Sequence, residues 1–215
     1  MALSGRTPAT RGYSMGARNS AVERTRRAIT EATMRLHERI GPRFTTVSAI
    51  AEEAQVTRVT IYKHFPDDEA LVVACSSHWG FLHPRPDASR WVKISDPVAR
   101  LRTALHETYE WAATAAPMMT MIYRDVDSMP SFVAEFLAAD ESTRVGALVR
   151  GFRAQGRRAR RLEASIRHAL RITTWQSLCS VGGLTNAEAT DVMVGAVLAA
   201  AHTSKPRARP ARSAN

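Results

Sequence analysis

Apolar side chains recur at helical spacing along most of this sequence. Ile29, Ala32 and Leu36 follow one another at steps of three or four residues, and Gly41 and Pro42 end the helix that they define. No segment alternates apolar and polar residues with the period of two that is typical of a half-buried strand. The pattern therefore predicts an all-α fold.

Three further helices are predicted between residues 46 and 82. Thr46 and Thr57 are placed to cap the first two, because a threonine hydroxyl accepts a hydrogen bond from an unpaired backbone N–H at a helix start. The second of the two ends at Pro66, since proline cannot continue a helix. The third begins at Asp67 and runs to about Leu82, with acidic residues at its positive N-terminal end.

The Pro-rich segment HPRPDASRWVKISDP, which begins at His83, marks a predicted domain boundary. At its end, Asp96 and Pro97 form the pattern of an N-cap followed by proline in the first helical position. Further helices are expected over about residues 117–127, 131–152, 160–179 and 186–202.

Composition narrows the class of protein. With 45% hydrophobic residues among 215, the chain is able to bury a core. No run of about 18 apolar residues is present, which excludes a membrane span. The first 20 residues lack the apolar stretch of a secretory signal peptide, so we expect a cytoplasmic protein. Cys75 and Cys179 lie more than 100 residues apart, which argues against a disulfide framework.

The charge balance points to an anionic partner. Lys and Arg number 30 against 20 Asp and Glu, a net charge of +10. Seven of these ten excess charges lie in residues 1–20 and 203–215, whose polar and Arg-rich composition predicts disorder. Two interpretations of these ends stay open: solvated tails without a function, and weak contact with a DNA backbone.

Residues 45–64, TTVSAIAEEAQVTRVTIYKH, have the layout of a helix-turn-helix motif: a short capped helix, a tight turn and a second short helix. The longer stretch FTTVSAIAEEAQVTRVTIYKHFPDDEAL resembles the DNA-binding signature of the TetR family. The resemblance runs from Arg24 to Ala74, and the apolar, capping and aromatic residues all stand at the positions where the family signature has them. The alternative is a helical hairpin inside a bundle, in which Tyr62 and Phe65 are core residues.

The sequence departs from the family pattern in three respects. Gln55 stands at a turn position where glycine is common, so positive φ and strain of roughly 1 kcal/mol are expected there. Asp68 stands where the family often has a lysine that contacts a DNA phosphate. Because a carboxylate repels phosphate, we do not predict a DNA contact for Asp68. Residues 21–70 carry no net charge, and their basic contribution lies on the first helix at Arg24, Arg26 and Arg27.

The second helix of the motif carries the chemistry for reading DNA. Arg58 offers a bidentate fork suited to guanine O6 and N7, so it is the predicted base reader. We assign Val59 and Phe65 to the core side of this helix, although Val59 also lies within the segment expected at the groove. The resemblance implies a phosphate contact for Thr46 and a base-facing position for Ser48. The predicted DNA-contacting residues are Thr46, Ser48, Arg58, Val59, Thr60, Tyr62, Lys63 and His64.

The resemblance also implies an organisation for the whole chain, because the remaining helices of the family form a domain that dimerises and holds a small ligand. The expected parts are a disordered basic extension (1–20), a helix-turn-helix domain (21–82, with a linking helix at 67–82), a helical regulatory and dimerisation domain (96–202) and a disordered basic tail (203–215). The last two helices resemble the dimer interface. The apolar surface expected on the last helix consists of Ala187, Val194, Val197, Leu198, Ala200 and Ala201.

A ligand pocket is expected among methionine and aromatic residues, since methionine adapts to irregular ligands and aromatic rings stack on them. For each of these residues taken singly, a core position is the stronger interpretation. Likewise, a helix buried within one subunit would show an apolar surface similar to that of a dimer helix. The predicted pocket residues are Tyr109, Trp111, Met118, Met121, Tyr123, Phe132, Phe136 and Trp175.

Two other clusters do not lead to a predicted site. The stretch from Arg144 to Arg161 holds seven arginines and no acid, and we interpret it as an exposed loop between helices. Cys75, His78 and His83 match no closed zinc pattern, so no metal and no cofactor are predicted.

The function predicted from these observations is a TetR-type transcriptional regulator. We expect a homodimeric repressor that binds an inverted-repeat operator in double-stranded DNA and is released by a small molecule. An enzyme is the weaker hypothesis, because the sequence contains no H-E-x-x-H, G-x-S-x-G or P-loop motif. A third hypothesis is a nonspecific nucleic-acid-binding protein, which predicts a steep salt dependence and little sequence preference.

Overall fold

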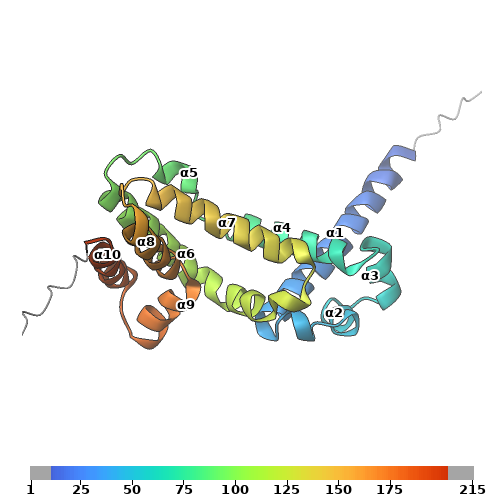
Figure 1. The fold of residues 1–215 in the computed structure, drawn as a ribbon. Coiled ribbons are helices and arrows are strands. Elements are labelled where there is room, and N and C mark those ends of the chain that lie inside the picture. Colours follow the sequence, from blue (N-terminus) through green and yellow to red (C-terminus); the bar gives the residue numbers. More distant parts are fainter. Residues whose placement is uncertain (1–10, 203–215) are drawn as a thin grey trace, which may run out of the picture. The chain divides into compact units, whose positions relative to one another are not determined.

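The structure, a computed structural model, describes residues 11–202, and every regular element in that range is a helix (Figure 1). The all-α prediction is therefore confirmed. The chain divides into two compact units. The first comprises the residues up to Leu82 together with Met121–Ser128, and the second comprises His83–Thr120 and the residues from Met129 onward.

The first unit is a small helical domain with its own core. Its elements are α1 (Arg11–Arg39), the 3₁₀ turn η1 (Pro42–Phe44), α2 (Val47–Glu53), α3 (Arg58–His64) and α4 (Asp68–Leu82). Helix α1 packs against α2 and α4, and α2 packs against α3. The side chains buried between these helices are Ile29, Leu36, Ile50, Ala51, Ile61, Phe65 and Leu71.

Three side-chain caps set where these helices begin. Thr46, Thr57 and Asp67 each accept a hydrogen bond from the backbone N–H three residues later, at 3.1, 3.1 and 2.7 Å. Such a bond satisfies one of the amides that a helix start leaves unpaired. The predicted caps are confirmed, and so is the predicted end of α4 at Leu82.

Helix α1 begins earlier than the sequence predicts. Residues 11–20 are helical, whereas we expected disorder through Ser20. The physical reason is that extending an existing helix adds one hydrogen bond for each residue fixed, so a helix stabilised by packing near Ile29 propagates outward at low cost. The rest of the predicted extension, residues 1–10, lies outside the described residues, and so does the predicted tail at 203–215.

The first unit also contains a segment that comes from later in the chain. The Arg124 guanidinium donates two hydrogen bonds to Asp125, at 2.7 and 2.8 Å, and a third to the backbone carbonyl of Ile40 at 2.9 Å. Asp125 also accepts from the backbone N–H of Arg43 at 3.2 Å. Gly41 has φ of 90°, and a Cβ there would collide with Arg124 and Asp125. A glycine is therefore required at this turn on both conformational and steric grounds.

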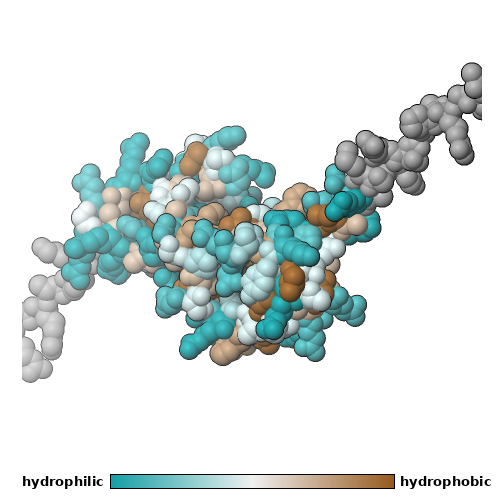
Figure 2. Space-filling view, turned by 90° about the vertical axis from the view of Figure 1, so that its right-hand side faces the viewer, coloured by the Kyte–Doolittle hydropathy of each residue, from teal (hydrophilic) through white to brown (hydrophobic). Residues whose placement is uncertain are grey.

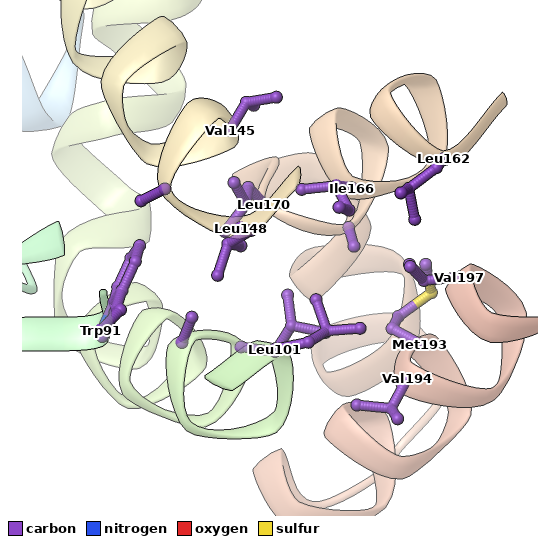
Figure 3. Close-up of a cluster of buried hydrophobic side chains, with 14 of the residues drawn as sticks. Trp91, Leu101, Val145, Leu148, Leu162, Ile166, Leu170, Met193, Val194 and Val197 are labelled. Atoms are coloured by element: carbon purple, nitrogen blue, oxygen red, sulfur yellow. The ribbon is translucent and has the colours of Figure 1, made fainter. Parts of the chain in front are cut away.

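The second unit is a larger helical bundle. Its elements are α5 (Ala88–Trp91), most of α6 (Pro97–Asp125), α7 (Ser131–Val149), α8 (Gly156–Ala169), α9 (Ile172–Trp175), the π-helical segment η3 (Gln176–Val181) and α10 (Asn186–His202), whereas the 3₁₀ turn η2 (Val126–Ser128) belongs to the first unit. Helix α8 packs against α7 and α10, and α5 packs against α7. Figure 3 shows the core between them, where Leu148, Ile166 and Val197 are fully buried.

Two helix boundaries in this part differ from the prediction. We expected a separate helix to begin at Pro117, but α6 continues through it, because buried alanines and methionines on both sides of the proline hold the helix in the core. We also expected one helix over 160–179, but α8 ends at Ala169. Leu170 and Ile172 are both buried, and residues two apart do not share one helix face, so the chain turns there.

The arginine-rich stretch from Arg144 to Arg161 is an exposed loop only in part. Residues 150–155 join α7 to α8, with Arg150 and Arg153 exposed, as predicted. Arg144 lies in α7, is 6% exposed, and donates to the Thr108 hydroxyl at 2.7 Å. The last four of the seven arginines lie in α8, and Arg158 donates to the backbone carbonyl of Ala201 at 3.0 Å. Helix α8 thus begins four residues before the predicted helix at 160, so Arg157 and Arg158 are helical.

Figure 2 shows hydrophobic residues as separate patches among hydrophilic ones on the face that it draws. Between residues 11 and 202, no helix is both long enough and apolar enough for a membrane span.

Candidate nucleic-acid interface

Helix α3 presents one face to solvent and the other to the core of the first unit. Ile61 and Phe65 are each 1% exposed and fill that core. Val59 and Tyr62, by contrast, are 63% and 55% exposed. Arg58 and Lys63 are exposed as well. The result is a short helix with a mixed cationic, aromatic and aliphatic outer face.

The assignment of Val59 to the core side was wrong. The helix contains two apolar pairs at helical spacing, Val59 with Tyr62 and Ile61 with Phe65, and either pair satisfies the periodicity. Packing against α1 and α2 selects the second pair, since Ile61 and Phe65 belong to the same buried cluster as Ile29 and Ile50.

The turn between α2 and α3 is a tight helix end. The backbone N–H of Val56 donates to the carbonyl of Ala51 at 2.9 Å, and that of Gln55 donates to Glu52 at 3.1 Å. These are the two hydrogen bonds of a Schellman motif, which needs a left-handed residue just after the helix. Gln55 is that residue, with φ of 53°, so the positive φ predicted at this position is confirmed.

Arg26 of α1 anchors the end of α3. Its Nη1 atom donates to the backbone carbonyl of His64 at 2.7 Å, and its guanidinium lies 4.3 Å from the centroid of the Phe65 ring. A cation at the C-terminal end of a helix satisfies a free carbonyl and interacts favourably with the helix dipole. From the sequence, Arg26 is expected only to add basic charge, because no local pattern relates residues 38 positions apart.

Three other arginines of α1 form ion pairs with glutamates. Arg27 pairs with Glu31 at 2.7 Å on the exposed side of the helix. Arg35 and Arg39 both bind the carboxylate of Glu53 in α2, each at 2.9 Å. These guanidiniums hold the pKa of the Glu53 carboxyl below its usual value. The pairs tie α1 to α2 and reduce the free positive charge on α1.

All eight predicted DNA-contacting residues lie on one short part of the chain, from the N-cap of α2 to the end of α3. Thr60 and His64 are half-buried and the other six are exposed, so each side chain has some access to solvent. The Thr57 and Thr60 hydroxyls lie 2.9 Å apart, which orients Thr60 at the start of α3. That these eight residues contact DNA, at bases or at phosphates, stays a prediction.

Negative charge borders this surface on one side. Asp67 caps α4, and the exposed Asp68 and Glu69 follow in the first helical turn. Carboxylates stabilise the positive end of α4 through its dipole, but they repel a phosphate backbone. The exposed positive charge on α3 itself comes from Arg58 and Lys63.

The predicted ligand residues are placed in different surroundings. Met121 and Tyr123 belong to the first unit, and the other six belong to the second. Tyr109 is fully buried and donates to the backbone carbonyl of Ala169 at 2.9 Å, which is the geometry of a core residue. Burial raises the pKa of its hydroxyl. Met118 is also buried, Phe136 and Tyr123 are exposed, and Trp111, Met121, Phe132 and Trp175 are partly buried.

A hollow of about 550 Å³ lies elsewhere in the second unit, on the outer face of α8 and the start of α9. Arg160, Arg167 and Arg171 line it, and no predicted pocket residue does. Arg167 is already paired there with Glu141 and Glu163, at 2.8 and 3.0 Å.

The cysteine and histidine residues considered as metal ligands have other contacts. Cys75 is buried, and its sulfur lies 3.8 Å from Nδ1 of His37. Burial raises the pKa of the Cys75 thiol to about 12, so it stays protonated. His78 lies 3.7 Å from Glu31. Among residues 11–202, no three His, Cys, Asp or Glu residues come together as metal ligands would.

Comparison with known proteins connects this geometry to a family. Residues 29–75 match the family model described as bacterial regulatory proteins, tetR family. The chain carries a TetR-family domain. The matched residues contain the buried core of the first unit, both helices of the motif and the first half of α4. No curated protein matches the chain.

Solved structures extend the likeness beyond the TetR-family domain. A putative fatty acid metabolism regulator from Clostridium perfringens superposes with a TM-score of 0.58 at 16% identity, covering 83% of this chain and 100% of its own. AibR, solved in complex with isovaleryl coenzyme A and operator DNA, gives 0.61 at 22% identity, covering 80% and 97%. A tetR-family transcriptional regulator from Streptomyces coelicolor gives 0.56 at 19% identity, covering 83% and 80%. The chain thus has the fold of TetR-family transcriptional regulators.

Proposed function

We propose that this protein is a ligand-responsive transcriptional regulator that binds an inverted-repeat operator as a homodimer. The observation that carries the proposal is the outer face of α3. A capped seven-residue helix, held from behind by Ile61 and Phe65, keeps Arg58 and Lys63 exposed together with Tyr62. A helix of this kind fits the major groove, and its rigid support limits the entropy lost on binding.

The side chains of α3 divide into a base reader and backbone contacts. Arg58 is the first residue of the helix, and the N-terminal residues of a recognition helix are the ones that reach base edges. Its guanidinium is able to donate two hydrogen bonds to O6 and N7 of guanine. Such a bidentate contact favours the correct base over a wrong one by about 1–3 kcal/mol of binding free energy. The hydroxyls of Thr46 and Tyr62 and the ammonium of Lys63 suit phosphate oxygens, which set the register without reading sequence.

A second copy of the chain is the proposed partner for α10. The predicted apolar face of this helix needs one correction, because Val194, Val197 and Ala201 are buried within the unit itself. The face left to a partner carries small and aliphatic residues at helical spacing, which allow two helices to approach closely. The exposed members of this face are Val192, Gly195, Ala196 and Ala199.

Dimer symmetry leads to a specific expectation for the operator. Two copies of α3 related by a two-fold axis read two inverted half-sites, spaced about 34–36 Å apart in the simplest case. Selection of bound sites from random duplex DNA by the purified protein tests this. Recovery of an inverted repeat supports the proposal, and recovery of no motif contradicts it.

The Arg58→Ala variant separates this function from nonspecific nucleic-acid binding. If Arg58 reads a base, the variant loses discrimination at one base pair in each half-site and keeps it elsewhere. If the protein binds only the backbone, the variant loses a small and equal amount of affinity for every sequence. Competition binding of operator variants that differ at a single base pair distinguishes the two results.

A small molecule is the proposed effector, as suggested by AibR, whose structure contains both isovaleryl coenzyme A and operator DNA. Release of DNA by an effector requires a coupling free energy, typically about 1–3 kcal/mol, and the coupling is reciprocal. Operator DNA must therefore weaken effector binding by the same factor. Equal effector affinity with and without operator, measured by equilibrium titration, would exclude induction.

A further inference from the structure

One arginine of the second unit is enclosed by groups that bind cations. The guanidinium carbon of Arg85 lies 4.9 Å from the ring centroid of Trp111 and 5.8 Å from that of Phe136. Its Nη1 atom donates to the Asp140 carboxylate at 2.9 Å, and its Nη2 atom donates to the Met119 sulfur at 3.5 Å. Two aromatic faces, a carboxylate and a thioether thus surround one planar cation. We call these four groups the cation cage.

The four residues of the cage lie in long helices, whereas Arg85 lies outside any helix. Trp111 and Met119 lie in α6, and Phe136 and Asp140 lie one turn apart in α7. Arg85 lies between Pro84 and Pro86 in the irregular segment that joins α4 to α5. Arg85 is therefore held in the cage by its side-chain contacts and not by a place in a helix.

The walls keep their own support when Arg85 is removed. Trp111 is oriented by a hydrogen bond from Nε1 to the backbone carbonyl of His83 at 3.1 Å. Asp140 has a second cation nearby, since Nη1 of the buried Arg144 lies 3.9 Å from the same carboxylate oxygen. Asp140 is therefore not left as an isolated charge, which is the condition under which a buried carboxylate would collapse the site.

The cage is reachable from solvent. The side chains of Arg85 and Asp140 are 18% and 24% exposed, and Phe136 is 59% exposed. A ligand from solution therefore has direct access to the Phe136 ring and to the carboxylate one helical turn away.

We propose that the cation cage is a binding site for an organic cation that carries a guanidinium or substituted ammonium group, and that Arg85 is an intrachain occupant which this cation displaces. Aromatic faces attract such cations through the ring quadrupole, and the carboxylate adds charge pairing. This inference names the ligand class of the proposed regulator and in that respect rests on the proposed function.

Occupancy of the cage by Arg85 makes a quantitative prediction. A ligand that must displace Arg85 binds with an apparent affinity reduced by the fraction of molecules in which the cage is open, so removal of an occupant present in nine molecules of ten gains about tenfold. The Arg85→Ala variant should therefore bind ethylguanidinium more tightly than the unmodified protein does, by about tenfold where the cage is open in one molecule of ten.

Calorimetric titration without DNA provides the test, with the full chain and with the variants Arg85→Ala and Arg90→Ala. Arg90 is exposed in α5 and outside the cage, so Arg90→Ala removes the same charge and should leave the affinity for ethylguanidinium unchanged. In the Arg85→Ala background, Phe136→Leu should reduce the gained affinity, because it keeps an apolar side chain and removes the ring. Phe136 is exposed, so this variant does not depend on repacking a core.

Three outcomes would overturn the proposal: equal affinity of the unmodified protein and Arg85→Ala for ethylguanidinium, no effect of Phe136→Leu on the gain, or binding of benzoate that Arg85→Ala abolishes. The last would show that Arg85 itself captures an anion. Failure here is distinct from failure of the proposed function, since operator selection uses DNA alone and does not involve the cage.

Discussion

Gln55 holds a conformation that costs a residue with a Cβ. Its φ of 53° closes the Schellman turn between α2 and α3, and its side chain is exposed. For a residue with a Cβ, the left-handed region is unfavourable by roughly 1–2 kcal/mol. Glycine avoids this strain, but it loses more backbone entropy on folding, which offsets part of the gain.

Gln55→Gly should therefore stabilise the first unit by up to about 1 kcal/mol. Urea unfolding monitored by circular dichroism measures the change in the unfolding free energy. The matched variant Gln55→Ala keeps the Cβ and the strain, so it should stay within roughly 0.5 kcal/mol of the unmodified protein. A stabilisation by alanine equal to that by glycine would contradict the role of backbone strain.

His37 is a buried titratable residue of the first unit. It is 5% exposed, and burial disfavours the imidazolium, which lowers the pKa of His37 from 6.5 to about 4. The negative charge of Asp125 opposes this shift but does not cancel it. The folded protein therefore keeps His37 neutral at pH values where an unfolded chain would protonate it.

Stability should fall as the pH decreases through this window. Between pH 6.5 and pH 4 the unfolded state binds more protons than the folded state does, and above pH 6.5 histidine is neutral in both. The resulting loss between pH 7 and pH 5 is roughly 2 kcal/mol from His37. Urea unfolding at the two pH values should show this difference for the unmodified protein and not for His37→Gln. The same pH dependence in both proteins would assign it to other groups.

At the scale of the element, the position of α3 depends on a contact from α1. Arg26 satisfies the carbonyl of His64 and covers the ring of Phe65. Hydrogen bonds from charged groups contribute about 1.5–3 kcal/mol when they are partly buried. An exposed pair between neighbouring turns of one helix, such as Arg27 with Glu31, contributes only about 0.3–0.5 kcal/mol.

Arg26→Ala should thus destabilise the first unit by about 1–3 kcal/mol, and Arg27→Ala by less than about 0.5 kcal/mol, although each removes one positive charge. The measurement is thermal unfolding of both variants, followed by DNA binding at a temperature where both are folded. Arg26→Ala should also weaken binding to all operator variants by the same factor, since it loosens the whole of α3. Equal destabilisation by both variants would mean that Arg26 acts only through its charge.

Helix starts in this protein were predictable because their cause is local. Thr46, Thr57 and Asp67 each bond to an amide three residues away, and a short window of sequence contains both partners. The continuation of α6 through Pro117 was not predictable in this way. A proline signals a helix end, and only the burial of its neighbours in the bundle overrides that signal.

At the scale of the whole molecule, positive charge is concentrated at the ends of the chain. Residues 203–215 contain four basic residues and no acid, whereas residues 21–70 are neutral. Charges that neutralise phosphates release counterions, and each phosphate contact adds about 0.9 to the slope of affinity against salt concentration on logarithmic scales.

Removal of residues 203–215 should lower the affinity for operator and non-operator DNA by the same factor and reduce the salt slope by up to about 4. The preference between two operator sequences should stay unchanged, because backbone contacts carry no sequence information. Fluorescence anisotropy over a range of salt concentrations measures both quantities. An altered sequence preference in the shortened protein would indicate that the tail reads bases.

The sequence by itself determined the helical class, the caps and the helix-turn-helix segment, because these follow from periodicity and from partners a few residues apart. The tertiary structure alone decided between Val59 and Ile61 as the core residue of α3, since both fit the period and only packing distinguishes them. It also assigned Arg26 to His64 and Arg85 to the cation cage. These contacts join residues tens of positions apart, where no local rule applies and the fold must first bring the partners together.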